Sequence, residues 1–174
     1  MIRSLLLVLA LVSAPLLAQA QADTPAAEHK LSVSTGLGFM SSIGSGSFSQ
    51  SAFLWQADFQ YFLTEAISAG AFMQVAPADG LTIFNFAADA RYHFKAADKL
   101  NPYAGFGFGL AHAGADVGNA SANGALFSFI AGIEYDLMEQ VALTSDMRFN
   151  LVAGDSFADT FLFTWQIVGA RFRF

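Results

Sequence analysis

The sequence predicts an all-β protein, an eight-stranded antiparallel, transmembrane up-and-down β-barrel. The first observation is that apolar and polar residues alternate with a period of two from Leu31 to Phe174. The second is that most of the eight alternating segments have ten or more residues, whereas strands of soluble sheets usually have about five or six. The third is that bulky aromatic residues share one face of these segments, opposite small or charged ones.

The composition excludes several other classes of protein. Of the 174 residues, 55% are hydrophobic and 13% are charged, about half of the charged share in soluble domains. After residue 20, no apolar run approaches the roughly 18 residues of a membrane-spanning helix. The net charge of −6 argues against binding of nucleic acid. The absence of cysteine excludes disulfides, thiolate metal sites, thiol nucleophiles and a lipoprotein acyl anchor.

Residues 1–22 are predicted to be a secretory signal peptide. Arg3 precedes an apolar stretch over residues 5–17, and small residues at 18, 20 and 22 offer two cleavage sites. A buried N-terminal helix or a membrane anchor is the alternative, but the apolar stretch is short for an anchor. Residues 23–30 are polar and aperiodic, which predicts a flexible lead-in. The barrel is therefore predicted over residues 31–174.

The predicted strands cover residues 31–40, 51–62, 67–76, 81–94, 103–113, 125–137, 141–152 and 161–174. The second strand has Phe53, Trp55, Ala57, Phe59 and Tyr61 opposite Leu54, Gln56, Asp58 and Gln60. The fourth has Phe84, Phe86, Ala88, Ala90, Tyr92 and Phe94 opposite Asn85, Ala87, Asp89, Arg91 and His93. The sixth has Phe127, Phe129, Ala131, Ile133 and Tyr135 opposite Ser128, Gly132, Glu134 and Asp136. The seventh has Val141, Leu143, Met147, Phe149 and Leu151 opposite Thr144, Asp146, Arg148 and Asn150.

The eighth strand does not keep a single phase. Its C-terminal half has one apolar face, Val168, Ala170, Phe172 and Phe174, while Phe161, Phe163, Trp165 and Ile167 have the opposite phase. A β-bulge near Gly169 would restore one outward face. Alternatively, the aromatic residues of the first half point inward beneath the loops.

The direction of the two faces separates a membrane barrel from a soluble one such as a lipocalin. The polar face is mostly Gly, Ala and Ser, as at Gly105, Gly107 and Gly109, and would make a poor soluble surface. The aromatic face is too bulky for the interior of an eight-stranded barrel. Aromatic residues outward and small or ionic residues inward are typical of membrane barrels, whose sheets must also close.

Three segments resemble the eight-stranded outer-membrane barrels, namely the OmpA transmembrane domain, OmpX and the opacity porin-like proteins. They are residues 101–109 (NPYAGFGFG), residues 132–137 (GIEYDL) before a tight turn, and residues 171–174 (RFRF) at the C-terminus. The resemblance implies the outer membrane of a Gram-negative bacterium, without the peptidoglycan-binding domain of full-length OmpA. It also implies that Phe172 and Phe174 are an assembly signal for the barrel assembly machinery, with periplasmic chaperones as further partners.

In this topology the connections at 41–50, 77–80, 114–124 and 153–160 are extracellular loops, and the others are periplasmic turns. The loops are short for a receptor or an adhesin, and they contain no Lys or Arg. Their carboxylates are Asp79, Asp116, Asp155 and Asp159. These form a solvated rim, bind basic partners, or contact lipopolysaccharide through divalent cations.

The polar faces of the strands bring nearly balanced charges into the predicted lumen. The inward set is Asp58, Asp89, Arg91, His93, Glu134, Asp136, Asp146, Arg148, Arg171 and Arg173. Because unpaired buried charges are costly, these residues are expected to pair and to plug the barrel. The alternative is a gated conduit in which the pairs exchange partners and admit small ions.

The sequence therefore predicts an integral outer-membrane barrel with a structural or surface-interaction role, such as membrane integrity, adhesion or contact with a host surface. A small diffusion channel is the second hypothesis. A lipid A-modifying enzyme is the third, because such enzymes need Ser, His and an acid near the outer leaflet, and His112, Asp116 and Ser121 lie near that rim. Their spacing matches no deacylase motif, so no catalytic residue, metal or cofactor is expected. Outer-membrane lipid and lipopolysaccharide are the expected surroundings.

Overall fold

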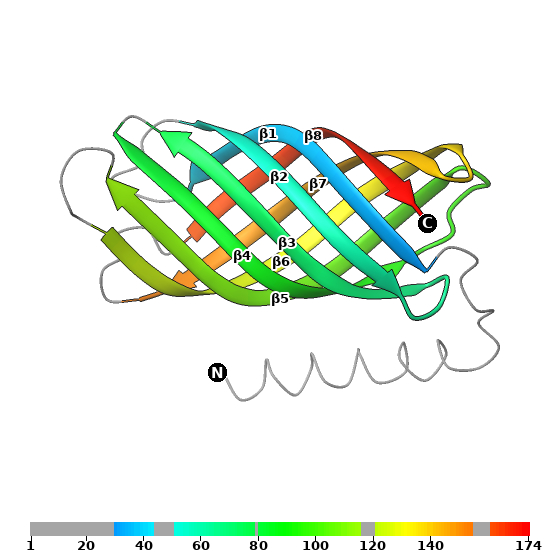
Figure 1. Ribbon diagram of the computed structural model, residues 1–174, viewed down its shortest axis with the longest axis horizontal. Coiled ribbons are helices and arrows are strands. Elements are labelled where there is room, and N and C mark those ends of the chain that lie inside the picture. Colours follow the sequence, from blue (N-terminus) through cyan, green and yellow to red (C-terminus); the bar gives the residue numbers. More distant parts are fainter. Residues whose placement is uncertain (1–29, 44–50, 79, 116–120, 155–160) are drawn as a thin grey trace.

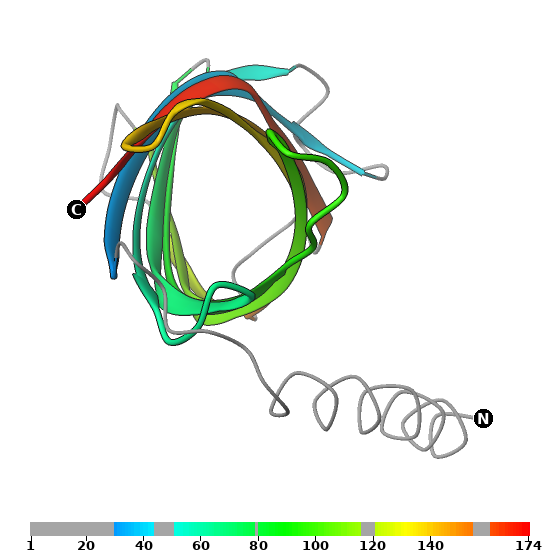
Figure 2. The same ribbon diagram turned by 90° about the vertical axis from the view of Figure 1, so that its right-hand side faces the viewer.

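The computed structural model describes residues 30–43, 51–78, 80–115, 121–154 and 161–174. The predicted signal peptide, lead-in residues 23–29 and the four loop aspartates lie outside the described residues. The described chain is a closed barrel of eight antiparallel strands in sequential order, as predicted (Figures 1 and 2). No helix in these ranges is long and apolar enough to cross a membrane. The strands are β1 (Leu31–Ser42), β2 (Ala52–Phe62), β3 (Ile67–Ala78), β4 (Leu81–His93), β5 (Leu100–Ala115), β6 (Ser121–Met138), β7 (Val141–Ala153) and β8 (Phe161–Arg173).

Each strand alternates between an exposed and a buried face, because successive side chains of a strand point to opposite sides of the sheet. On β2, for example, Phe53 is 55% exposed and its neighbour Leu54 is fully buried. Phe86 and Phe129 are likewise exposed on the outer wall. The aromatic face therefore points outward and the polar face inward, as the sequence predicts.

The two ends of the barrel differ in their connections. One end, here called the turn end, carries short turns and both ends of the described barrel, where the Leu31 amide donates to the Phe174 carbonyl (3.2 Å). There Thr64 Oγ1 accepts the amide N–H of Ile67 (3.0 Å) and fixes the turn between β2 and β3. The opposite end, the loop end, includes the turn between β3 and β4, where Gly80 has a φ of +74°. Only glycine adopts this backbone conformation without strain.

A β-bulge in β8 settles the phase of this strand. Leu37 on β1 pairs with Val168, but the next residue, Gly38, pairs with Gln166, so that Ile167 is extra. Ile167 and Val168 are both 54% exposed and both point outward. The bulge keeps Trp165 and Phe172 on the lipid side although they are an odd number of residues apart. The inward orientation of the first half of the strand is therefore wrong.

Five strands are longer than the sequence predicts, β5 and β6 by five residues each and β1, β3 and β7 by one or two. β5 begins at Leu100 and includes Pro102, and β6 extends from Ser121 to Met138. The last residue pair of β4 and β5 is His93 with Tyr103, and Pro102 lies just beyond it. The Pro102 carbonyl accepts a hydrogen bond from the Phe94 amide (2.7 Å). The missing N–H of Pro102 therefore falls at the end of the ladder, where proline is tolerated.

Deletion of Val168 is expected to leave a folded barrel, because removing one bulge residue gives β8 a regular alternation with Trp165 and Phe172 outward. Deletion of Ser145 from β7 is the control, since it reverses the faces of one half of the strand. The measurement is the shift in mobility of refolded protein on unheated versus heated gels. Equal folding of both deletions, or failure of the Val168 deletion alone, would contradict this account of β8.

Candidate functional site: the barrel lumen

Toward the loop end, the lumen holds a set of buried apolar side chains beside the buried polar residues Gln74, Asn85, Asn150 and Thr164. Every strand contributes one residue to this layer, which we call the apolar plug: Met40, Leu54, Ala76, Ile83, Ala111, Leu126, Val152 and Leu162. None of the eight is more than 2% exposed. The sequence analysis expected a polar lumen and missed this layer, because its members lie singly at the loop ends of otherwise polar faces.

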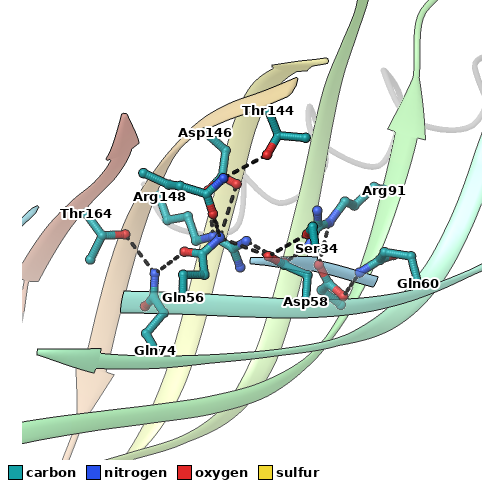
Figure 3. A network of polar contacts seen from close by, with 12 residues as sticks. Ser34, Gln56, Asp58, Gln60, Gln74, Arg91, Thr144, Asp146, Arg148 and Thr164 are labelled. Carbon is teal, nitrogen blue, oxygen red and sulfur yellow. Dashed lines mark hydrogen bonds and ion pairs between the residues drawn. The ribbon is translucent and has the colours of Figure 1, made fainter. Parts of the chain in front are cut away.

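The turn-end half of the lumen is ionic, and Asp58 is at its centre (Figure 3). Asp58 Oδ1 accepts hydrogen bonds from the guanidinium of Arg91 on β4 and from that of Arg148 on β7, the latter at 2.7 Å. Ser34 Oγ donates to the other carboxylate oxygen at 3.3 Å. All three charged side chains are buried, so one carboxylate joins three strands across the lumen.

The two arginines are held in the same way by their own strands. Arg91 Nε donates to Asp89 (2.6 Å), and Arg148 Nε donates to Asp146 (2.9 Å). Each carboxylate precedes its arginine by two residues, and residues two apart on a strand share a face. The Asp-x-Arg spacing therefore lets each strand orient its own guanidinium toward Asp58.

Neutral amides complete this network. Gln60 Nε2 donates to Asp89 (2.7 Å), and Gln56 Nε2 shares its two protons among Asp58 (3.0 Å), Asp146 (3.1 Å) and Gln166 Oε1 (2.9 Å). These bonds matter because the central cluster has one more carboxylate than guanidinium, and amide donors stabilise a buried carboxylate. The sequence analysis placed these glutamines on the inner face but gave them no role.

A second ionic cluster lies nearer the turn end. Glu134 on β6 binds both Arg171 and Arg173 of β8, and Arg173 also contacts Asp136 (2.6 Å). Asn101 Nδ2 donates to the same aspartate (2.8 Å). A cavity of about 530 Å³ opens beside this cluster, lined by Lys95, Ala96, Ala97, Asp98, Asn101 and Asp136. Solvent therefore reaches the rim of this cluster at Asp136, while Glu134 and Arg171 are buried.

Tyr103 separates the two clusters. The guanidinium carbons of Arg91 and Arg171 lie 5.4 and 5.5 Å from its ring centroid, and its hydroxyl donates to Asp146 (3.2 Å). These distances allow cation–π attraction. The ring occupies the space opposite Gly132, where a Cβ atom would lie 2.5 Å from Tyr103 Cζ. The glycine of the GIEYDL segment is thus required for close packing of this tyrosine.

His93 is joined to the ionic network by neutral side chains. Its Nε2 lies 2.9 Å from Ser68 Oγ, and Ser68 Oγ donates to Gln60 Oε1 (3.0 Å). Because carboxylates only accept, Gln60 must direct its NH₂ group to Asp89 and its oxygen to Ser68. The hydroxyl proton of Ser68 is therefore used in the hydrogen bond to Gln60. Since this proton cannot also be donated to His93, His93 must donate from Nε2.

All ten residues predicted to line the lumen face inward or contact its ionic clusters, with Arg173 and Asp136 at its rim. Phe172 and Phe174 point outward at the turn end and are 45% and 69% exposed. His112 lies on the outer wall, where its Nδ1 is 2.8 Å from Asn123 Oδ1. In the register of β5 and β6, the residue opposite His112 is Asn123, and Ser121 is opposite Gly114. Asp116 lies outside the described residues. Within the described ranges, no group of three or more His, Asp or Glu side chains could hold a metal ion.

Comparison with known proteins identifies the family. The outer membrane protein beta-barrel domain matches residues 4–172, so the chain belongs to this family and is a protein of the outer membrane. No curated protein sequence matches the chain significantly.

Solved structures of similar fold agree. Neisserial surface protein A is 18% identical with a TM-score of 0.72, and the alignment covers 83% of this chain and 97% of that protein. The N-terminal barrel of Pseudomonas aeruginosa OprF is 18% identical (TM-score 0.60; 84% and 98% covered). Ail, the attachment invasion locus protein of Yersinia pestis, is 14% identical (0.58; 85% and 100%). At these identities the comparison shows the fold alone.

Replacing the shared carboxylate, Asp58→Ala, is expected to lower the free energy of unfolding by about 3–5 kcal/mol, because two buried guanidinium groups lose a partner. Ser34→Ala is the control, since it removes only a neutral donor to the same carboxylate and should cost about 1 kcal/mol. Urea unfolding of the refolded barrel measures both. Equal losses in the two variants would show that Asp58 does not hold the arginines.

His93 is expected to carry a proton on Nε2, as the directions of its hydrogen bonds require. ¹⁵N NMR of histidine-labelled protein distinguishes a protonated Nε2 from a protonated Nδ1. Gln60→Leu releases the serine proton, so this variant should show a mixture of tautomers. A wild-type protein with its proton on Nδ1 would contradict the proposed order of donors and acceptors.

Proposed function

We propose that this member of the outer-membrane barrel family is a closed, non-conducting barrel with a structural and surface-interaction role in the outer membrane. The observation that carries the proposal is that the lumen holds two different barriers in series, the apolar plug and the ionic network. The supporting argument is that either barrier would by itself oppose the passage of a hydrated ion.

The apolar plug opposes permeation because it offers no substitute for water. An ion that entered the layer formed by Leu54, Ile83 and Leu126 would lose its hydration shell among side chains without polar atoms. Moving a charge from water into such surroundings is strongly unfavourable, and hydrophobic constrictions close pores by excluding water.

The ionic network opposes permeation because its charges already have partners. Freeing Arg148 would leave its buried guanidinium and the Asp146 carboxylate without an ionic partner, with a penalty of about 3–5 kcal/mol, while Asp58 would keep Arg91. The gated conduit requires this exchange and also a displacement of the apolar plug. Two independent rearrangements must then coincide, so we prefer the closed barrel over the small diffusion channel.

The chemistry of the loops limits the surface role. Ail has been solved with the heparin analogue sucrose octasulfate, a polyanion. The loop segments of the present chain contain four aspartates and no Lys or Arg, so binding of a polyanion is disfavoured here. We therefore propose that any surface partner is neutral or basic, and that contact with lipopolysaccharide uses divalent cations.

Two further roles belong to the same proposal. The outward aromatic residues at the C-terminus, Phe172 and Phe174, would serve as the signal for the barrel assembly machinery, with periplasmic chaperones as earlier partners. We propose no enzymatic activity, because His112 is hydrogen-bonded to an amide rather than to a serine or an acid.

Conductance of refolded protein in planar bilayers tests the closed barrel. Wild type and Arg148→Ala are both expected to give no resolvable currents, because the apolar plug remains in the variant. Adding Leu54→Ala and Leu126→Ala to Arg148→Ala weakens both barriers and should raise the current, which controls for insertion. Steady currents in the wild type that change with Arg148→Ala would favour the diffusion channel instead.

A further inference from the structure

The inner face of β1 is unusual because it is made almost entirely of small residues. From the turn end, its inward positions are Ser32, Ser34, Gly36 and Gly38, before Met40 of the apolar plug. β1 has β2 on one side and β8 on the other, and its pairing with β8 closes the barrel. The small side chains leave room in which β2 and β8 contact one another across β1.

Two glutamines use this room. Gln56 on β2 pairs with Gly36, and Gln166 on β8 pairs with Gly38. Gln56 Nε2 donates to Gln166 Oε1 (2.9 Å), and Gln166 Nε2 donates to Thr144 Oγ1 on β7 (2.8 Å). A Cβ atom at Gly36 would lie 2.5 Å from Gln166 Cδ. We call the chain Gln56–Gln166–Thr144 the strap, since it crosses the inner face of β1.

The strap lies where the closing pair of strands is weakest. The β-bulge interrupts the ladder between β1 and β8 at Ile167, the residue directly after Gln166, and a bulge leaves its extra residue without a partner in the ladder. The pairing of β7 with β8 shifts register at the same level, between Thr144 and Asp146. The strap therefore adds side-chain bonds at the level where the backbone ladder is irregular.

The backbone of each strap glutamine is also held from the lipid side. Trp55 Nε1 donates to Thr35 Oγ1 (3.0 Å), and this hydroxyl donates to the carbonyl of Gln56 (3.2 Å). On β8 the same arrangement recurs. Trp165 Nε1 donates to Ser145 Oγ (3.1 Å), which donates to the carbonyl of Gln166 (3.0 Å). Each hydroxyl lies 20 residues before its tryptophan.

These outer bonds have a clear physical reason. An indole N–H that faces hydrocarbon has no water to bind, so it needs a partner within the protein. The hydroxyl oxygen accepts the indole N–H. The hydroxyl group in turn donates a hydrogen bond to the carbonyl of the residue after the tryptophan. These hydrogen bonds join β1 to β2 and β7 to β8. The strap then joins the β1–β2 pair to the β7–β8 pair across the inner face of β1.

We propose that the strap is a latch that keeps the seam between β1 and β8 shut against lateral opening into the bilayer. Release of the Gln166 side chain would leave a glycine-lined, bulged seam as the weakest part of the wall. The latch would hold the wall of the barrel together at this seam. Its role is independent of whether ions pass along the barrel axis.

Hydrogen–deuterium exchange of the full mature chain in liposomes tests the latch. Gln166→Leu keeps the size of the side chain but removes both strap bonds. Thr144→Val instead removes only the bond between Gln166 and Thr144 and keeps the shape of the side chain. Both variants should increase exchange of the β1 and β8 amides around the bulge about tenfold, as expected for the loss of one to two hydrogen bonds, and leave β4 and β5 unchanged.

Gln60→Leu is the matched control, because Gln60 is also a buried lumen glutamine but bonds to Ser68 and Asp89 on β3 and β4. It should leave exchange at the seam unchanged. Unchanged exchange at the seam in Gln166→Leu, or an equal increase there in Gln60→Leu, would overturn the latch. Should Gln166→Leu fail to fold, Thr144→Val decides alone, with folding checked by gel mobility.

Discussion

The interior of an eight-stranded barrel is just wide enough for side chains, and this lack of space governs the rest of the structure. Lipid forbids an open edge, so the sheet must close on itself. Every second residue then enters a volume in which it must pack or find a polar partner. The eight residues of the apolar plug meet this demand by packing, and the charged residues of the other half meet it by pairing. Glycine occurs where neither solution leaves enough room, as at Gly132 beside Tyr103.

Much of this could be predicted from sequence, because a period of two reports which face is buried without any knowledge of neighbours. The strand number follows from that period, and the direction of the aromatic face follows from the bulk of its side chains. The broken phase of the last strand allowed either a bulge near Gly169 or inward aromatic residues. The location of the bulge at Ile167 does not follow from that period, since several positions would restore the phase equally well. The starts of β5 and β6 were placed too late because Pro102 and the small residues near Ser121 are typical of loops.

The contacts inside the lumen could not be predicted from the sequence, for a different reason. Asp58 and Arg148 lie 90 residues apart on strands that are not neighbours, so only the closure of the barrel brings them together. The apolar plug was missed because Leu54, Ile83 and Leu126 look like isolated exceptions when each strand is considered alone. Only the closed barrel shows that these exceptions belong to one buried cluster. The glutamines were overlooked because an amide carries no charge that would require a partner in a sequence-based argument.

The division of the lumen into two halves also explains why so many charges are tolerated inside a membrane protein. The ionic half adjoins the turn end, where a cavity beside Asp136 and Asn101 admits solvent. Charges near this opening are partly hydrated, and those deeper in, around Asp58, rely on amides and on the Asp-x-Arg geometry. Toward the apolar plug the charges give way to neutral side chains such as Gln74, Asn85 and Thr164, which hydrogen-bond to one another or to Gln56. Within the described residues, each buried charge of the lumen is therefore found where other side chains stabilise it.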